Sequence, residues 1–329
     1  MQTYPWLADT ATQLRHLQAH LPHAVLLHGS AGLGKRSLAI AFAHRLLCEK
    51  PTDVGACGQC DACYWLALGN HPDVLLVEPE QPEDAADGIE KRKTTHISID
   101  QVRALTDFLH TSAHRGGARI VVLHPAEALN TAAANALLKT LEEPPARSVL
   151  ILVSHQRARL LPTVLSRCHQ VRVIVPDAAL SMQWLSQQAI PDAALCLALA
   201  GGAPVQAVAL SPPELQAERR ACLIELSQPE HLAVVELAEK YAKLDTQGLL
   251  RWLIWLQQWS DDLISQRMAA RIGYHIDFVD VLRALAARMN VQQCFKFQQR
   301  LLEARRAAYH PLNTQMVVED VLLAYCALF

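Results

Sequence analysis

Short, almost continuous apolar runs alternate with longer amphipathic stretches in the first half of the chain. Such runs, without polar alternation, are typical of parallel strands buried on both faces. They predict five strands: Ala24 to His28, Asp73 to Glu78, Arg119 to His124, Ser148 to Ser154 and Gln170 to Val175. The stretches between them predict helices over Ser37 to Cys48, Ile99 to His110 and Thr131 to Glu143. This alternation predicts a doubly wound α/β domain, with a parallel sheet between helical layers.

After Val175 the strand-like runs disappear, and helical patterns continue to Phe329. Two Gly- and Pro-rich breaks, at 201–204 and 211–213, suggest where helical segments separate. We therefore expect three domains: an α/β domain over 1–175, a small helical domain over 176–210 and a larger helical domain over 211–329. Three tryptophans on one helical face, Trp252, Trp255 and Trp259, are expected in the core; a subunit-packing surface is the alternative.

Composition narrows the class of protein. Of 329 residues, 51% are hydrophobic and 19% charged, which argues against a disordered chain. No apolar stretch reaches membrane-spanning length, and the first residues do not resemble a signal peptide, so a cytoplasmic location without membrane contact is expected. The net charge of −2 restricts any DNA contact to a local patch. The charged stretch 81–93 is expected to form an exposed loop.

Four of the nine cysteines lie within sixteen residues, in the pattern C-x8-C-x2-C-x2-C. These are Cys48, Cys57, Cys60 and Cys63. Four thiolates at this spacing can complete a tetrahedral shell around one zinc ion, which leaves no open position and indicates a structural site. Four reduced cysteines on a loop are the alternative. A zinc deaminase would need an upstream His-x-Glu motif and an open fourth position, and the sequence has neither.

A glycine-rich loop follows the first predicted strand and resembles a phosphate-binding P-loop. Gly29, Gly34 and Lys35 match the pattern, but Arg36 stands where a working loop has Ser or Thr to coordinate magnesium. An arginine cannot be a metal ligand. The loop amides and Lys35 could still bind a nucleotide weakly; an inherited strand-to-helix turn without a ligand is the equal alternative.

Three features together resemble the bacterial clamp-loader subunits of DNA polymerase III, which are AAA+ proteins. They are the run from Asn130 to Pro145 (NTAAANALLKTLEEPP), the four-cysteine module after the P-loop helix, and the Ser166-Arg167-Cys168 triplet. The resemblance covers residues 20–175 and implies that the helical domains are a lid and an oligomerisation collar. It also implies a ring of five subunits, with ATPase (gamma/tau) subunits and a delta subunit, that loads a sliding clamp onto primed DNA.

The resemblance also indicates that this chain does not hydrolyse ATP. An active relative has Asp-Glu after its third strand; here His124-Pro125 follow, and Glu127 comes too late to replace them. The degenerate site, together with the Asn70-His71-Pro72-Asp73 segment, is most similar to one subunit type of this group that lacks ATPase activity. Productive binding of ATP and magnesium is therefore not expected.

Arg167 is expected to be an arginine finger, because the matching arginine of the family reaches the nucleotide of a neighbouring subunit. Such an arginine finger neutralises charge on the transferring phosphoryl group. Ser166 is expected to orient the turn, and Cys168 to be a packing residue. A surface arginine paired with a local carboxylate is the alternative. An active ATPase of the same family and a pure scaffold both remain alternatives for the whole chain.

Two further residues are weaker candidates for DNA contact. Ser98 and Arg103 lie at the start of a helix that, in the family, faces the template duplex, where amides and charge could bind phosphate. An ordinary capped helix with a solvated arginine is the equal alternative. His71 is expected to order its loop rather than to bind zinc.

Overall fold

The computed structural model describes residues 4–80, 96–114, 117–309 and 313–329. The chain divides into two compact units, Met1–Pro176 and Asp177–Phe329. The predicted domain limits at 175 and 210 stay predictions. The stretch 81–93, expected to form an exposed loop, lies outside the described residues.

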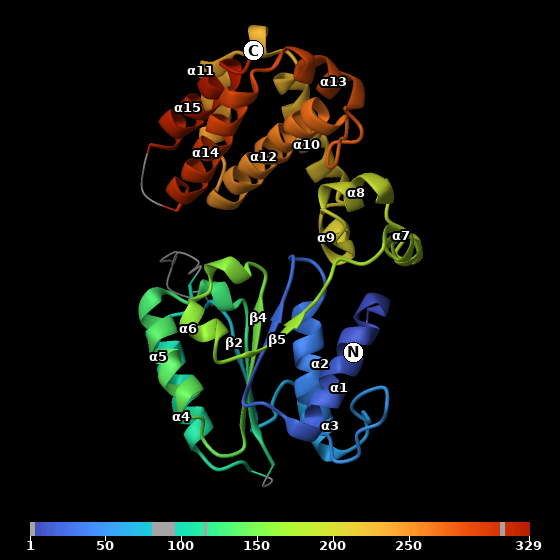
Figure 1. Cartoon of the computed structure of the whole chain (residues 1–329), viewed down its shortest axis with the longest axis vertical. Coiled ribbons are helices and arrows are strands. Elements are labelled where there is room, and N and C mark those ends of the chain that lie inside the picture. The colour runs from blue at the N-terminus through green and yellow to red at the C-terminus, as the bar shows by residue number, and fades with distance from the viewer. Residues whose placement is uncertain (1–3, 81–95, 115–116, 310–312) are drawn as a thin grey trace, which may run out of the picture. The chain divides into compact units, whose positions relative to one another are not determined.

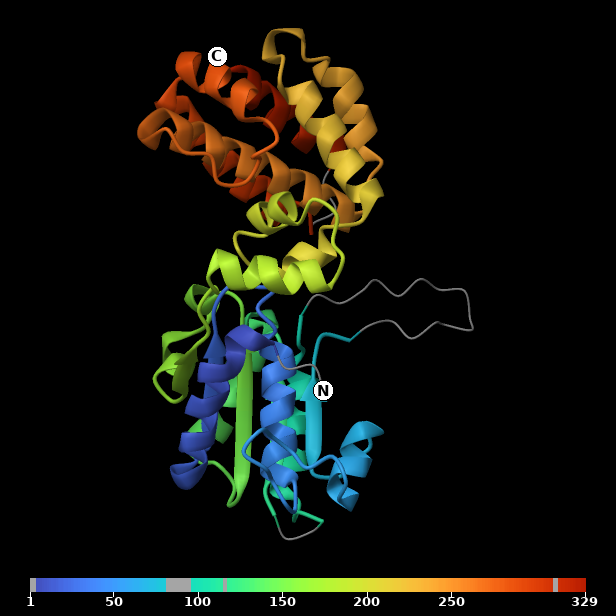
Figure 2. The same cartoon turned by 90° about the vertical axis from the view of Figure 1, so that its right-hand side faces the viewer.

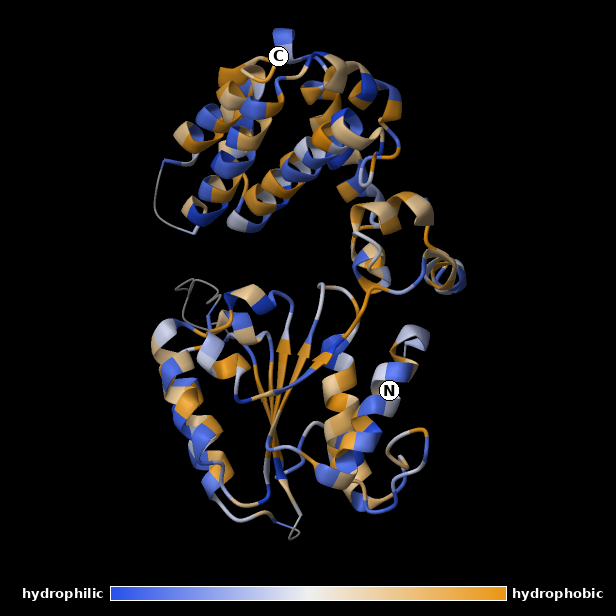
Figure 3. Ribbon diagram, in the orientation of Figure 1, coloured by the Kyte–Doolittle hydropathy of each residue, from blue (hydrophilic) through white to orange (hydrophobic). Residues whose placement is uncertain are grey.

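The described part of the first unit contains a parallel five-stranded sheet with the order β2-β3-β4-β1-β5 (Figure 1). The strands are β1 (Ala24–His28), β2 (Val74–Val77), β3 (Arg119–Leu123), β4 (Ser148–Ser154) and β5 (His169–Arg172). In the register, Val25 of β1 lies opposite Ile151 of β4 and His169 of β5. The predicted α/β fold class is confirmed, and the strands are coloured as hydrophobic over most of their length in Figure 3.

The predicted limits of the fifth strand were wrong. The sequence suggested Gln170 to Val175, whereas β5 is His169–Arg172. Val173 makes one more backbone hydrogen bond, from its N–H to the His28 carbonyl oxygen at 2.8 Å. The chain then leaves the sheet, and the side chains of Ile174 and Val175 are exposed. The apolar run is therefore longer than the segment for which β1 offers a partner.

Helices cover both faces of the sheet: α1 and α2 on one face, α4 and α5 on the other (Figure 1 and Figure 2). The helices of this unit are α1 (Ala8–Leu17), α2 (Lys35–Leu47), α3 (Asp61–Ala67), α4 (Ile99–His110), α5 (Thr131–Glu142) and α6 (Pro162–Leu165), with 3-10 turns η1 (Pro5–Leu7), η2 (Gln18–His20), η3 (Ala126–Ala128) and η4 (Arg157–Arg159). The three predicted helices are confirmed as α2, α4 and α5, whereas α1, α3 and α6 were not predicted.

The apolar faces of α4 and α5 form one core with the strands. Val102, Leu105 and Leu109 of α4 and Leu137 and Leu141 of α5 are buried there. Each helix also begins with a side-chain cap, which satisfies a backbone N–H that would otherwise lack a partner. These apolar stripes and caps explain why the limits of α4 and α5 were readable from the sequence.

The second unit is helical. Its helices are α7 (Ala178–Gln187), α8 (Ala193–Leu199), α9 (Pro204–Ala209), α10 (Pro213–Leu226), α11 (Val234–Ala242), α12 (Thr246–Ala269), α13 (Val279–Arg288), α14 (Val291–Ala307) and α15 (Thr314–Cys326), with the 3-10 turn η5 (Pro229–His231). Helices α7 to α9 share a small apolar cluster, and α10 to α15 share a larger one. Trp252, Trp255 and Trp259 are buried in the larger cluster, which confirms them as core residues. Among the described residues, none of the helices has both the length and the apolar character needed to cross a membrane.

Candidate functional site

The degenerate P-loop lies at the edge of the sheet where the parallel strands end. Gly29 follows β1, Glu78 follows β2, His124 follows β3 and His155 follows β4. Carboxyl ends of parallel strands share one edge of a sheet, and ligands of α/β folds bind there. Sequence reasoning singled out the loop and His124 but missed Glu78 and His155. Their signal was available, because Glu78 ends one predicted strand and His155 directly follows another.

Two glycines of the loop are required by close packing. A Cβ atom on Gly29 would lie 2.2 Å from the Val173 carbonyl oxygen, and one on Gly34 would lie 2.4 Å from the Tyr4 ring. Both glycines also have positive φ angles, which side chains disfavour. Trp6 adds a hydrogen bond from its Nε1 to the Leu33 carbonyl oxygen at 3.0 Å. The residues just before α1 therefore pack directly against the loop.

Lys35, the residue that would contact a nucleotide phosphate, is turned toward its own loop. Its Nζ donates to the carbonyl oxygens of Gly29 at 2.8 Å and Ser30 at 2.5 Å, and the residue is 1% exposed. Burial lowers the pKa of Lys35 to about 8. The predicted phosphate ligands Gly29, Gly34 and Lys35 thus come together in a P-loop, while nucleotide binding to them stays a prediction.

Arg36, which stands where a working P-loop has its magnesium-coordinating Ser or Thr, forms an ion pair with Glu78. Its Nε and Nη2 donate to the two carboxylate oxygens of Glu78 at 2.7 and 2.8 Å. His124 Nδ1 lies 2.7 Å from Glu78 Oε1, so the carboxylate has two partners. The hydrogen bonds from Arg36, followed by the contact with His124, lower the pKa of Glu78. The Glu78 carboxylate is therefore paired with an arginine and a histidine.

His155 continues this network. Its Nε2 lies 3.1 Å from Nε2 of His124, and its backbone N–H donates to Glu127 Oε1 at 2.9 Å. Burial and the charge of Lys35 lower the pKa of His155 to about 4. The sequence places Glu127 too late to replace the lost acidic pair. In the structure its carboxylate accepts this hydrogen bond from the residue that follows β4. Among the described residues, no set of three potential metal ligands gathers at this site.

Arg167 lies away from this network, just after α6. Its Nη2 is 2.6 Å from Glu142 Oε1, and its Nη1 donates to the Thr163 carbonyl oxygen at 3.0 Å and to Ser166 Oγ at 3.3 Å. Ser166 Oγ in turn donates to the same Thr163 carbonyl oxygen at 3.0 Å, which fits its expected role in orienting the turn. Cys168 is buried, in agreement with a packing residue, and burial raises its pKa to about 12.

The four cysteines of the predicted zinc site come together, with all four sulfur atoms within 4.8 Å of one another. The pairs Cys48–Cys60, Cys57–Cys63 and Cys48–Cys63 are 4.0, 3.9 and 3.7 Å apart. Sulfur atoms at the corners of a zinc tetrahedron lie about 3.8 Å apart. The cluster is therefore consistent with a structural zinc site.

Backbone N–H groups point at these sulfur atoms, as expected around thiolates. Cys57 N–H donates to Cys48 Sγ at 3.2 Å and Gly58 N–H to Cys63 Sγ at 3.3 Å. The N–H groups of Gln59 and Cys60 donate to Cys57 Sγ and lower the pKa of Cys57 to about 6. Donors of this kind stabilise the deprotonated form that a metal needs.

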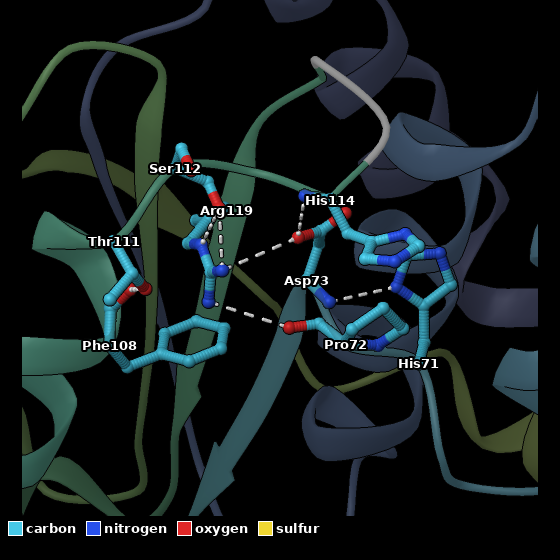
Figure 4. Close-up of polar contacts among 8 residues, drawn as sticks. All are labelled: His71, Pro72, Asp73, Phe108, Thr111, Ser112, His114 and Arg119. Carbon is cyan, nitrogen blue, oxygen red and sulfur yellow. Dashed lines mark hydrogen bonds and ion pairs between the residues drawn. The ribbon is translucent and has the colours of Figure 1, made fainter.

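The Asn70-His71-Pro72-Asp73 segment forms a structural network at the opposite edge of the sheet (Figure 4). His71 Nδ1 accepts from the Asp73 N–H at 3.1 Å, and its ring lies edge-on to Trp65 of α3, with centroids 5.9 Å apart. The group of potential metal ligands in the cysteine cluster consists of the four cysteines and does not include His71. These contacts agree with its expected role in ordering the loop, which stays a prediction.

Asp73 continues the network toward β3. Its buried carboxylate accepts from the His114 N–H at 2.9 Å and lies 3.9 Å from Nη2 of Arg119 (Figure 4). The Arg119 guanidinium lies 4.5 Å from the ring centroid of Phe108 and donates to the Ser112 carbonyl oxygen at 2.7 Å. The segment thus connects α3 and α4 to the amino ends of β2 and β3.

Ser98 and Arg103, the DNA-contact candidates, are engaged in local contacts. Ser98 Oγ accepts from the Gln101 N–H at 3.2 Å, and Gln101 Oε1 accepts from the Ser98 N–H at 2.9 Å, forming a capping box. Arg103 pairs with Asp100 at 3.0 Å, and both side chains are well exposed. These contacts agree with the alternative of an ordinary capped helix, and DNA contact stays a prediction.

Comparisons with known proteins identify relatives of this chain. Residues 9–176 match the family model described as "DNA polymerase III, delta subunit". The chain is 37% identical to DNA polymerase III subunit delta' of Pseudomonas aeruginosa, over 99% of this chain and 98% of the relative. It is 35% identical to the subunit delta' of Yersinia pestis, over 87% of this chain and 84% of the relative. A solved gamma subunit-related protein of Thermotoga maritima covers 96% of this chain and 99% of its own at 20% identity, with a TM-score of 0.49.

The parallel P-loop sheet, the helical unit and the Ser166-Arg167-Cys168 triplet, taken with these relatives, define an AAA+ protein of the clamp-loader class. Within that class, the match along almost the whole chain is to one subunit. The chain belongs to the delta' subunit family of DNA polymerase III.

Proposed function

We propose that this chain serves the clamp loader as a subunit that hydrolyses no ATP itself and donates Arg167 to the nucleotide of a neighbouring ATPase subunit. The observation that supports the first half is the Arg36–Glu78 pair with His124, since Arg36 and His124 stand at the sequence positions of the lost magnesium ligands and both contact one carboxylate. Without a metal site, phosphoryl transfer lacks its main source of charge stabilisation.

The position of Arg167 supports the second half. The side chain is 34% exposed and is held by one carboxylate and two hydrogen-bond acceptors of the same turn. A guanidinium at the surface can leave such partners for a phosphate, because both anions accept parallel N–H bonds. The ATPase (gamma/tau) subunits and the delta subunit are the proposed partners. The proposed assembly is a cytoplasmic pentamer that places the sliding clamp on primed DNA.

The test is the DNA- and clamp-stimulated ATPase of a reconstituted loader that contains the Arg167→Ala chain. An arginine finger raises the rate at the site it serves by about 10³- to 10⁵-fold, so turnover at that site should be lost. Arg167→Lys keeps the charge but not the two-pronged donor and should recover little activity. Arg159→Ala, which removes an exposed arginine of the same unit, is the matched control and should leave the rate unchanged.

Assembly is measured separately by size-exclusion chromatography. An Arg167→Ala loader that assembles and keeps its full ATPase rate would show that the chain is a scaffold. ATP turnover by the isolated chain, in the absence of partner subunits, would support the active-ATPase alternative.

We also propose that Cys48, Cys57, Cys60 and Cys63 bind one structural zinc ion per chain. The sulfur separations and the N–H donors support this, and a closed shell leaves no position for a reacting water. Metal analysis should find about one zinc per chain and almost none after Cys57, Cys60 and Cys63 are all replaced by serine. Cys326→Ser, outside the cluster, should retain the metal. Zinc that persists in the triple variant would exclude this site.

A phosphate contact by Ser98 and Arg103 is a weaker proposal. The amino end of α4 offers backbone amides, and the Arg103–Asp100 pair is exposed and easily exchanged. Because the Ser98 hydroxyl is already used as the helix cap, Arg103 would provide most of the contact.

A further inference from the structure

Glu142 is the only carboxylate among the described residues that forms an ion pair with Arg167. It is the last residue of α5, and its Oε1 lies 2.6 Å from Arg167 Nη2. Its side chain is 51% exposed, against 34% for Arg167. The other contacts of the guanidinium, to the Thr163 carbonyl oxygen and Ser166 Oγ, involve neutral acceptors. In the described part of the chain, Glu142 therefore supplies the negative charge that pairs with this arginine.

The position of Glu142 is locally unfavourable. A helix carries partial negative charge at its carboxyl end, so a carboxylate in the last turn is destabilising there. Glu143 follows directly and adds a second negative charge. Local helix preference therefore does not account for Glu142, whereas its contact with Arg167 is favourable.

We propose that Glu142 is a positioning residue that restrains Arg167 until a neighbour's nucleotide phosphate displaces it. This rests on the proposed role of Arg167 as a finger. Carboxylate and phosphate compete for the same guanidinium N–H groups, and a carboxylate left in place would cancel the charge that the phosphate needs. The pair is exposed, so the exchange is cheap. Glu142 thereby keeps Arg167 from binding other anions while the neighbouring site is empty.

The test is the ATP dependence of the reconstituted, clamp- and DNA-stimulated loader with the Glu142→Gln chain. Removing a competitor of this strength should lower the apparent KM for ATP by about 1.5- to 5-fold, with kcat unchanged. The gain should shrink as salt rises, because salt already screens the exposed pair. Glu143→Gln removes a neighbouring charge of the same helix end and should leave KM unchanged.

The Arg167→Ala background provides the decisive comparison. Glu142→Gln should have no effect there, since the two residues act through one contact. An unchanged or raised KM, or a reduced kcat, in the single Glu142→Gln variant would overturn the proposal. If Arg167→Ala lowers the ATPase rate and Glu142→Gln has no effect, only this inference fails. If Arg167→Ala also has no effect, the proposed function fails with it.

Discussion

Arg36–Glu78 and Arg167–Glu142, two ion pairs of the first unit, differ in what surrounds the carboxylate. Glu78 accepts hydrogen bonds from both Nε and Nη2 of Arg36 and also contacts His124. Glu142, by contrast, makes a single contact with Arg167, at 2.6 Å. The arginines are similarly exposed, at 43% and 34%, but the carboxylates are 31% and 51% exposed. The same ion-pair chemistry therefore gives a carboxylate with two partners in one place and a carboxylate with one partner in the other, which fits the different roles proposed for Arg36 and Arg167. The difference between the two pairs lies in the number of side chains that contact the carboxylate.

Among these predictions, the substitution of Glu78 is expected to change local stability the most. Glu78→Ala leaves Arg36 and His124 without their shared acceptor and should lower the local free energy of opening by about 1.5–3 kcal/mol. Glu142→Ala, the matched change at the other pair, should cost less than about 1 kcal/mol. Amide hydrogen exchange along α2, β2 and β3 measures the first, and exchange along α5 and α6 the second. Equal losses at the two pairs would contradict the distinction drawn between them.

Lowering the pH is expected to reduce folding stability by a smaller amount, through His155 of the Glu78 network. His155 is neutral in the folded chain because burial lowers its pKa to about 4, below the usual value near 6.5. Between pH 6.5 and 4 the unfolded chain gains a proton that the folded chain does not, so stability falls as the pH falls. Partial solvation limits this contribution to about 1 kcal/mol.

His155→Gln should flatten the decline of stability with acid, as followed by hydrogen exchange at pH 6.5, 5 and 4. His169→Gln, which changes an exposed histidine of the same unit, is the control and should keep the decline. A His155→Gln chain that declines as steeply as the parent would show that other groups carry the acid response.

The smallest effect is expected from Arg36→Thr, which restores a single residue of the P-loop pattern and should not restore ATP turnover. Arg36→Thr restores a hydroxyl beside Lys35, yet no acidic pair follows β3, so ATPase activity should stay at background. The phosphate released by the isolated variant chain, with and without magnesium, measures this. Substantial turnover would show that Glu78, freed from Arg36, can complete a metal site, and would refute the interpretation of positions 124 and 125.

Much of the fold was predictable because its signals are local. The limits of β1, β4 and α4 agree with the prediction, since apolar runs and a capping serine mark them. The limits of β5 were wrong because they depend on how far β1 offers a partner. Helix α3 is seven residues long and begins between the last two cysteines of the cluster, so its apolar pattern is too short to recognise.

The candidate site was predictable in its residue types but not in its contacts. The sequence determined that the magnesium ligand is absent, that four cysteines are spaced for a metal, and that an arginine stands in the Ser166-Arg167-Cys168 triplet. These features depend on residue identity at fixed spacing. Only the tertiary structure decided that Arg36 meets Glu78, 42 residues away, and that Glu142 meets Arg167. Partners so far apart in sequence are chosen by strand order and helix placement, which local patterns do not encode.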